Sequence, residues 1–180
     1  MHTQPQLTVR EIQEKDINFI ADYWLCSTPE YLRAMGADKA KLPTRQQWET
    51  MLQNQLAQPY NQKQAYATIW EVNGEAIGHC NVNKIQFGEE AYMHLHIWKP
   101  GARKSGFGAE LVKKSLPFFF DNLQLKTLYC EPYALNPAPN KTLQKVGFKL
   151  LKEYITTPGH INFEQPVKLW ELSAEDFSRR

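Results

Sequence analysis

One stretch of the chain, from Ala91 to Asn122, restricts the fold more than any other. Its first part alternates apolar and polar side chains, which predicts a strand over Ala91–Trp98. Pro100 removes a backbone donor and ends that strand, and a helix is predicted from about Gly106 to Asn122. A strand that leads through a short turn into a helix is typical of a sheet covered by helices.

The patterns on both sides of this stretch add further strands and helices. Asn73-Gly74 is a strong hairpin signal, and Asp16 is expected to cap the first helix. The other predicted strands are Leu7–Glu11, a segment around Ala65–Ile69, Ala76–Val82, Thr127–Glu131, Phe148–Thr156 and Val167–Leu172. The other predicted helices are 16–24, a short piece within 29–36, one opened by Pro43-Thr44 with Trp48, Met51, Leu52 and Leu56 on one face, and Pro139–Val146. This order predicts one α+β domain over residues 1–180, with a mixed sheet and helices on its faces.

Composition excludes several classes of protein. The net charge of +2 is too small to indicate binding to nucleic acid or to an anionic membrane. No apolar run approaches the roughly 20 residues that span a bilayer, and the N-terminus lacks a signal-peptide pattern. The three cysteines are far apart in sequence, which favours reduced thiols and a cytoplasmic location.

The turn between the strand and the helix has the composition of an anion site. Gly106 and Gly108 allow the backbone to approach a bulky anion, and Arg103 and Lys104 add positive charge. The unpaired amides of the first helical turn, with the helix dipole, would face the same anion. A pyrophosphate group fits such a turn. The alternative is that the two glycines only relieve crowding at a tight connection.

Two motifs in this order resemble the GNAT acyltransferase superfamily. Arg103, Gly106 and Gly108 satisfy its Arg/Gln-x-x-Gly-x-Gly/Ala signature at a strand-to-helix turn. A second region, from Glu131 through Asn136 to Gly147-Phe148, looks like the later family motif, in which an Asn precedes a short helix that ends in Gly-Phe. The resemblance implies a mixed sheet with a V-shaped cleft between the strands that end at Trp98 and Glu131, and acetyl-CoA bound there without a metal.

The resemblance also implies which residues contact the cofactor. The backbone around His96, Ile97 and Trp98 would hold the acetyl-pantetheine end, and Asn136 would contact the pantetheine arm. Leu95 is one residue further from the cofactor and is not among the predicted contacts. The pyrophosphate would lie on the turn, whose residues are Arg103, Lys104, Ser105, Gly106, Phe107, Gly108 and Ala109.

Transfer to an amine requires its deprotonation, which costs roughly 4–5 kcal/mol at neutral pH. By resemblance, Glu131 is the first candidate for the general base, and His96 or His94 is a candidate base or relay. No carboxylate or cysteine near these histidines completes a metal site. The alternative for Glu131 is a surface glutamate paired with a nearby lysine. The alternative for each histidine is a strand residue packed or hydrogen-bonded under a helix.

The motif does not assign the general acid, because Leu143 stands where the family often has a Tyr. Tyr133 is the first substitute, with Tyr129 nearby and Tyr154 further along. Cys130 raises the alternative of a covalent acetyl-enzyme, although a thiol in mid-strand without a paired base is more often inert.

The predicted function is direct transfer of an acetyl group to a primary amine of unidentified acceptor. Trp24, Tyr31, Trp48 and the segment 154–163 are candidate walls of the acceptor site, and no acidic cluster favours a polyamine. Domains of this family often form dimers, so a homodimer is one of the assemblies that the resemblance allows. Two alternatives are a degenerate domain that only binds CoA and a small RNA- or phosphate-binding domain.

Overall fold

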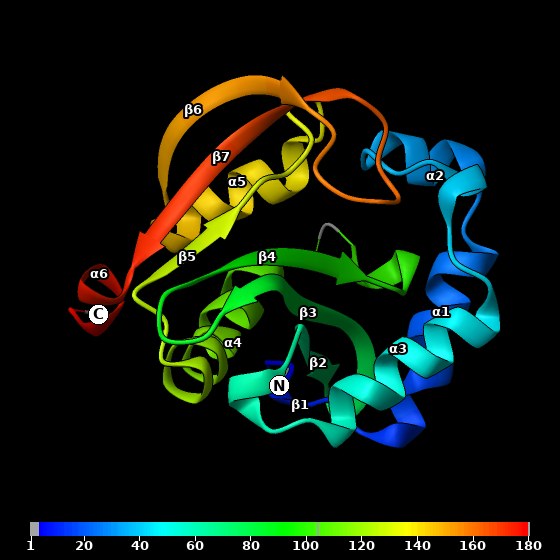
Figure 1. Ribbon diagram of the computed structural model, residues 1–180, viewed down its shortest axis with the longest axis horizontal. Coiled ribbons are helices and arrows are strands. Elements are labelled where there is room, and N and C mark those ends of the chain that lie inside the picture. The colour runs from blue at the N-terminus through cyan, green and yellow to red at the C-terminus, as the bar shows by residue number, and fades with distance from the viewer. Residues whose placement is uncertain (1–3, 104, 180) are drawn as a thin grey trace.

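The protein folds around one sheet of seven strands in the order β1-β2-β3-β4-β5-β7-β6 (Figure 1). The structure is a computed structural model that describes residues 4–103 and 105–179. Neighbouring strands are antiparallel except β4 and β5, which are parallel. The strands are β1 Leu7–Glu11, β2 Ala65–Val72, β3 Glu75–Gln86, β4 Glu90–Ile97, β5 Thr127–Cys130, β6 Lys149–Thr156 and β7 Gln165–Ser173. The predicted mixed sheet is confirmed.

Helices cover both faces of this sheet, as the alternation along β2 demonstrates. Tyr66 and Trp70 pack in one core cluster with α4 and α5, whereas Ala67 and Ile69 pack in another with α1 and α3. Because successive strand residues point to opposite faces, the two helix pairs lie on opposite sides of the sheet. The helices are α1 Ile17–Cys26, α2 Pro29–Ala34, α3 Arg45–Ala57, α4 Gly108–Leu123, α5 Pro137–Val146 and α6 Ala174–Ser178. None of them, over the residues described, has the length and apolar character needed to cross a membrane.

Three sequence predictions of local structure are corrected. The strand expected over Ala76–Val82 extends to Gln86, past an irregularity in its pairing with β4. The helix expected from Gly106 begins at Gly108, because Gly106 adopts the left-handed region with φ +82°. Met51, expected on the apolar face of α3, is 46% exposed.

Asp16 does not cap α1 through its side chain. Its buried carboxylate instead accepts hydrogen bonds from both terminal nitrogens of Arg10, at 2.7 and 2.9 Å, and from the backbone N–H of Gln13 at 2.8 Å. Arg10 also donates through Nε to Glu71 on β2 at 2.7 Å. This ion triad ties β1 and β2 to the beginning of α1, and it forms one end of the groove described below.

Candidate active site

Strands β4 and β5 separate halfway along β4, at a point that we call the fork. They pair from Glu90 with Thr127 to Met93 with Cys130, and β5 then ends. Beyond this point residues 94–97 of β4 stay paired with β3, whereas the chain after Cys130 follows β7. Its Pro132 carbonyl accepts from the Lys168 N–H at 3.1 Å, and the Ala134 N–H donates to the carbonyl of Pro166 at 2.8 Å. The divergence is visible toward the right of Figure 1, and it is the separation of strands that the family resemblance predicts.

The end of β5 is marked locally in the sequence. Pro132, two residues after the last residue of β5, has no N–H to donate and directs its carbonyl toward β7, so the regular ladder of β5 does not continue past Glu131. Beyond this point β4 keeps its pairing with β3, and the chain after β5 keeps its bonds to β7.

Backbone direction decides which residues of β4 can pair with a ligand in the fork. The Trp98 N–H donates to the carbonyl of Ile77 at 2.7 Å, and the His96 carbonyl points at Gly78, both on β3. Because backbone groups alternate along a strand, Leu95 and Ile97 direct their N–H and C=O groups to the other side, into the fork. Of the three residues expected to hold the ligand by their backbone, His96 and Trp98 therefore face β3, and Ile97 faces the fork. Leu95, which had been left out, faces the fork together with Ile97.

The turn after β4 leaves the first amides of α4 without a side-chain cap. Residues Pro100–Ala102 form a short 3-10 helix, and Ser105 Oγ donates to the carbonyl of Ala102 at 2.6 Å. A Cβ on Gly106 would meet nothing within 4 Å, so this glycine is required by its positive φ and not by crowding. Phe107 is the N-cap residue of α4 and supplies no side-chain cap, which leaves the amides of the first helical turn, Gly108 and Ala109 among them, for another partner.

Crowding does not require glycine at position 108. A Cβ there would lie 3.4 Å from Thr142 Oγ1 on α5, which is an ordinary van der Waals distance. Backbone conformation therefore explains Gly106, and neither crowding nor a positive φ explains Gly108. Lys104 lies outside the described residues.

Arg103 closes the end of the fork. Its Nε donates to the carbonyl of Ile97 at 3.1 Å, and one terminal nitrogen donates to the carbonyl of Trp98 at 3.3 Å. Its guanidinium carbon lies 4.0 Å from the centre of the Tyr31 ring, a cation–π contact with α2. In this structure Arg103 therefore binds the end of β4 instead of pointing freely at a phosphate.

Glu131 follows the last residue of β5, on the far side of the fork from β4. Partial burial raises the pKa of its carboxyl above the ordinary value, and the charges of Lys84 and Lys152 oppose that shift. No ion pair links Glu131 to either lysine within the described chain, so it is not the surface salt bridge considered as the alternative. A partly desolvated carboxylate of this kind suits a general base.

His96 has a different environment from the one a general base needs. Its ring is buried under α1, where Nδ1 shares a hydrogen bond with the Tyr23 hydroxyl at 3.1 Å. The ring stacks on His79 at 4.7 Å, and His79 Nδ1 accepts from Trp98 Nε1 at 2.7 Å. Burial, and secondarily the nearby histidines, hold the pKa of His96 well below its ordinary value. These contacts favour the alternative of a histidine packed under a helix. His94 likewise bonds Asn83 through its ring, at 2.9 Å.

The later motif contributes one polar side chain without a capping bond and one apolar side chain buried in the core. Asn136 is the N-cap residue of α5, and its side chain makes no capping bond. Leu143 is fully buried in the core, so the position at which the family often has a tyrosine hydroxyl carries none. Tyr133 pairs with Val167 as an isolated bridge beside the fork, and its ring meets Phe163 edge-on at 5.8 Å.

Cys130 lacks the environment of a nucleophile. Its buried thiol donates to the carbonyl of Met93 at 2.9 Å, and burial raises its pKa above the ordinary value. A thiol that is held protonated is a poor nucleophile. Within the described residues, no group of three or more His, Cys, Asp or Glu side chains is placed to hold a metal ion.

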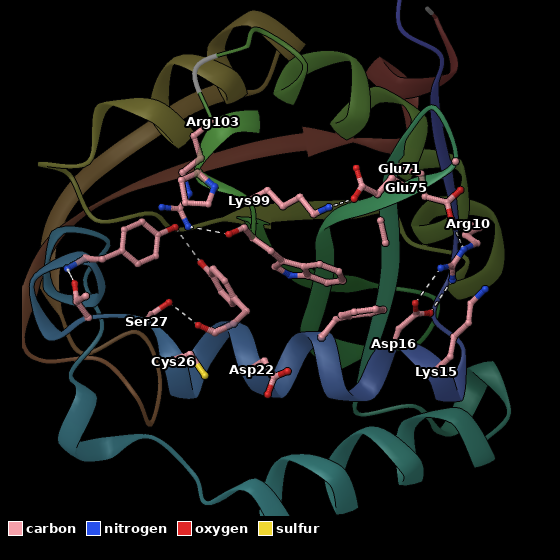
Figure 2. A pocket seen from close by; sticks show the side chains of 18 residues that line it. Arg10, Lys15, Asp16, Asp22, Cys26, Ser27, Glu71, Glu75, Lys99 and Arg103 are labelled. Atoms are coloured by element: carbon pink, nitrogen blue, oxygen red, sulfur yellow. Dashed lines mark hydrogen bonds and ion pairs between the residues drawn. The ribbon is translucent and has the colours of Figure 1, made fainter.

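A groove of about 840 Å³ runs along α1 and ends beside the fork. Figure 2 shows Lys15 and Asp16 at one end, with Arg10 and Glu71, and Cys26 and Ser27 at the other. Arg103 lines that second end and also holds the carbonyl of Ile97 in the fork, so the groove and the fork meet at this arginine.

The fold and the motifs define an acyltransferase-type domain, and the comparison with protein families agrees. Residues 6–149 match the model of the acetyltransferase (GNAT) domain, which is most of the chain. The protein therefore belongs to the GNAT acetyltransferase family. A search of curated proteins finds no match.

Solved structures show the same fold at low identity. Spermidine N-acetyltransferase from Vibrio cholerae, in complex with CoA and spermine, has a TM-score of 0.78 and 18% identity over 96% of this chain and 98% of that one. Mutant forms of the spermidine/spermine N-acetyltransferase from the same organism give a TM-score of 0.74 and 19% identity, over 97% and 99% of the two chains. The ribosomal L7/L12 alpha-N-protein acetyltransferase RimL, in complex with CoA, has a TM-score of 0.76 and 12% identity, over 94% and 95%.

Sequence reasoning missed several residues that shape this site. Leu95, Tyr23 and His79 carry no motif signal, and their roles depend on which strand or helix faces them. The alternation of backbone direction along residues 93–98 places Leu95 and Ile97 on one edge of the strand and His96 and Trp98 on the other. Which edge faces the fork could be assigned only once the position of β3 was known.

Proposed function

We propose that the protein is an acetyl-CoA-dependent N-acetyltransferase that moves the acetyl group directly to a primary amine. The observation that carries the proposal is the fork, where Leu95 and Ile97 direct their backbone groups away from β3, with the Ile97 carbonyl bonded to Arg103. The segment after it leads into α4, whose N-terminus has no side-chain cap. An extended pantetheine arm would pair with β4 as an added strand, and its pyrophosphate would meet the amides of 106–109. Asn136 would contact the arm from the opposite side.

Glu131 is the proposed general base in this reaction. The acceptor amine reaches the fork from the face covered by α1 and loses a proton to Glu131, directly or through water. The neutral amine attacks the thioester carbonyl, the carbon–sulfur bond breaks, and the thiolate of CoA leaves. Tyr133 is the proposed donor of the proton to that thiolate, because Leu143 has none to give. With a pKa of about 8.5, the thiolate is already a fair leaving group.

A CoA-binding domain without transferase activity is the second candidate. The buried Leu143 favours it, since this position lacks the hydroxyl that the family often has. The partly buried Glu131 favours the enzyme. Release of free thiol from acetyl-CoA in the presence of an amine separates the two candidates.

Acetyl-CoA is expected to stabilise the protein against thermal unfolding, and a Gly106→Asp variant is expected to lose that effect. At about 100 times its dissociation constant, a ligand adds roughly 2.7 kcal/mol, which raises Tm by several degrees for a domain of this size. Aspartate tolerates the positive φ of this position and places a negative charge where the pyrophosphate would lie.

Gly106→Asn is the matched control, because it has nearly the same shape and backbone tolerance but no charge. We expect it to keep most of the shift in Tm. An equal shift in the Asp and Asn variants would mean that the anion lies elsewhere, and no shift in the unsubstituted protein would contradict the proposed cofactor.

A further inference from the structure

The groove beside the fork contains many charges, but each of its acidic groups already has a cationic partner in the protein itself. Asp16 and Glu71 both pair with Arg10, and Glu75 pairs with Lys99. Asp22, the remaining carboxylate that lines the groove, pairs with Arg45. A polycation entering the groove would have to break these ion pairs.

Two of the cations in the groove have no carboxylate partner within the described residues. Lys15 lies beside the ion triad at one end, and Arg103 lies at the end that meets the fork (Figure 2). Among the residues that the structure describes, Arg103 bonds two backbone carbonyls and the face of the Tyr31 ring. Because Arg10 carries one charge against the two carboxylates of the triad, Lys15 balances the charge at its own end of the groove. The surplus positive charge therefore lies at the Arg103 end, where it favours a neutral or anionic ligand over a cationic one.

The groove also has an exposed aromatic surface and considerable length. Phe19 is 51% exposed and stacks on Trp98 at 5.8 Å, which provides an apolar area between the two ends. The ten residues of α1 extend over about 15 Å, longer than a small amine requires. Such a surface suits an elongated ligand with apolar or aromatic side chains.

We propose that this groove binds the acceptor and that the acceptor is the N-terminal segment of a polypeptide with neutral or negative net charge. This proposal rests on the proposed function, since it assigns the amine of the same reaction. The N-terminal amine lies at the Arg103 end beside the fork, the second or third side chain packs on Phe19 and Trp98, and acidic side chains approach Lys15. Polyamines would bind this groove poorly because of their charge, although the fold is similar to that of a polyamine-binding enzyme.

The test is direct binding of defined probes to the protein saturated with CoA, measured by calorimetry. The first probe is a six-residue peptide with a free N-terminus, an aromatic second residue and two glutamates. The second is the same peptide with both glutamates replaced by lysine, and the third is spermine. We expect the acidic peptide to bind at least about tenfold more tightly than either cationic probe.

Two pairs of variants connect this selectivity to the groove. Phe19→Ala should weaken binding of the acidic peptide by about tenfold, whereas Phe87→Ala, at an aromatic side chain that is also exposed but outside the groove, should not. Lys99→Ala leaves the Glu75 carboxylate unpaired in the groove and should improve spermine binding severalfold. Lys126→Ala breaks a similar exposed pair with Glu89 outside the groove and should not.

The outcomes also separate this proposal from the proposed function. Equal binding of the three probes, binding of none, or equal effects within either pair of variants would overturn the assignment of the groove. The shift of Tm with acetyl-CoA tests the cofactor independently of any acceptor. A protein that binds acetyl-CoA and acetylates spermine faster than the acidic peptide would remain an acetyltransferase, but with a different acceptor.

Discussion

Replacement of Glu131 by Gln is expected to lower kcat by at least about a hundredfold, the usual contribution of a positioned general base. Glutamine keeps the size of the side chain and removes its ability to take a proton from the amine. The measurement is thiol release with whichever amine gives the highest rate. The stabilisation by acetyl-CoA should remain, because the amides of the turn and not Glu131 are expected to hold the cofactor.

The pH dependence of kcat provides a second measure of the same role. Burial raises the pKa of Glu131 above its ordinary value, so the carboxylate should lose its charge at a higher pH than an exposed glutamate. Because a general base acts in its deprotonated form, kcat should fall as the pH is lowered through that pKa, and this limb should disappear in the Gln variant. Glu153→Gln, on the exposed strand β6, is the control. A Glu131→Gln enzyme with activity within threefold of the original would assign the base elsewhere.

Acidification from pH 7 to pH 5 is expected to remove roughly 2 kcal/mol of stability for each of the rings of His79, His94 and His96. Burial, with repulsion from His94 as a second cause, lowers the pKa of His79 to about 3. Burial, with the charge of Lys84 as a second cause, lowers the pKa of His94 to about 4, and burial also lowers the pKa of His96. In the unfolded chain all three rings titrate near 6.5. Below that pH the unfolded state binds protons that the folded state cannot, so the free energy of unfolding falls by up to about 1.4 kcal/mol per pH unit for each ring.

Urea unfolding at pH 7, 6 and 5 measures this loss. His79→Gln removes one of the three ionisable rings but keeps an acceptor for the Trp98 indole N–H, so it should reduce the dependence on pH by about a third. His160→Gln, at an exposed histidine, should leave the dependence unchanged. Equal stability at pH 7 and pH 5 would show that these rings accept protons without unfolding the protein. A loss of this size matters because domains are typically stable by only 5–15 kcal/mol.

Much of the cofactor site could be predicted from short segments of sequence, because their chemistry is local. Gly106 requires a positive φ, and Asn136 and Gly147 begin and end a short helix, whatever the rest of the chain does. The order of strands and helices around them also depends on local periodicity, and it gave the mixed sheet that the structure confirms. Errors at this level, such as the start of α4 and the end of β3, amount to two to four residues.

The direction of each functional group depends on the folded chain. An alternating strand does not reveal which neighbour lies on which side, so Leu95 and His96 could not be assigned to the fork or to β3 before β3 was placed. Asp16 has the local features of a helix cap, yet Arg10 on another element takes its carboxylate. His96 was selected by position alone, and its surroundings come from α1 and β3.

Local sequence was enough to specify the strand-to-helix turn, the later Asn and Gly-Phe motif, and through them the family. Folding was needed to bring Phe19, Glu75, Lys99 and Arg103 into one groove and to pair its carboxylates with cations. The physical reason is that backbone conformation at a turn depends on neighbouring residues, whereas burial, charge pairing and the path of a ligand depend on segments that are distant in the chain.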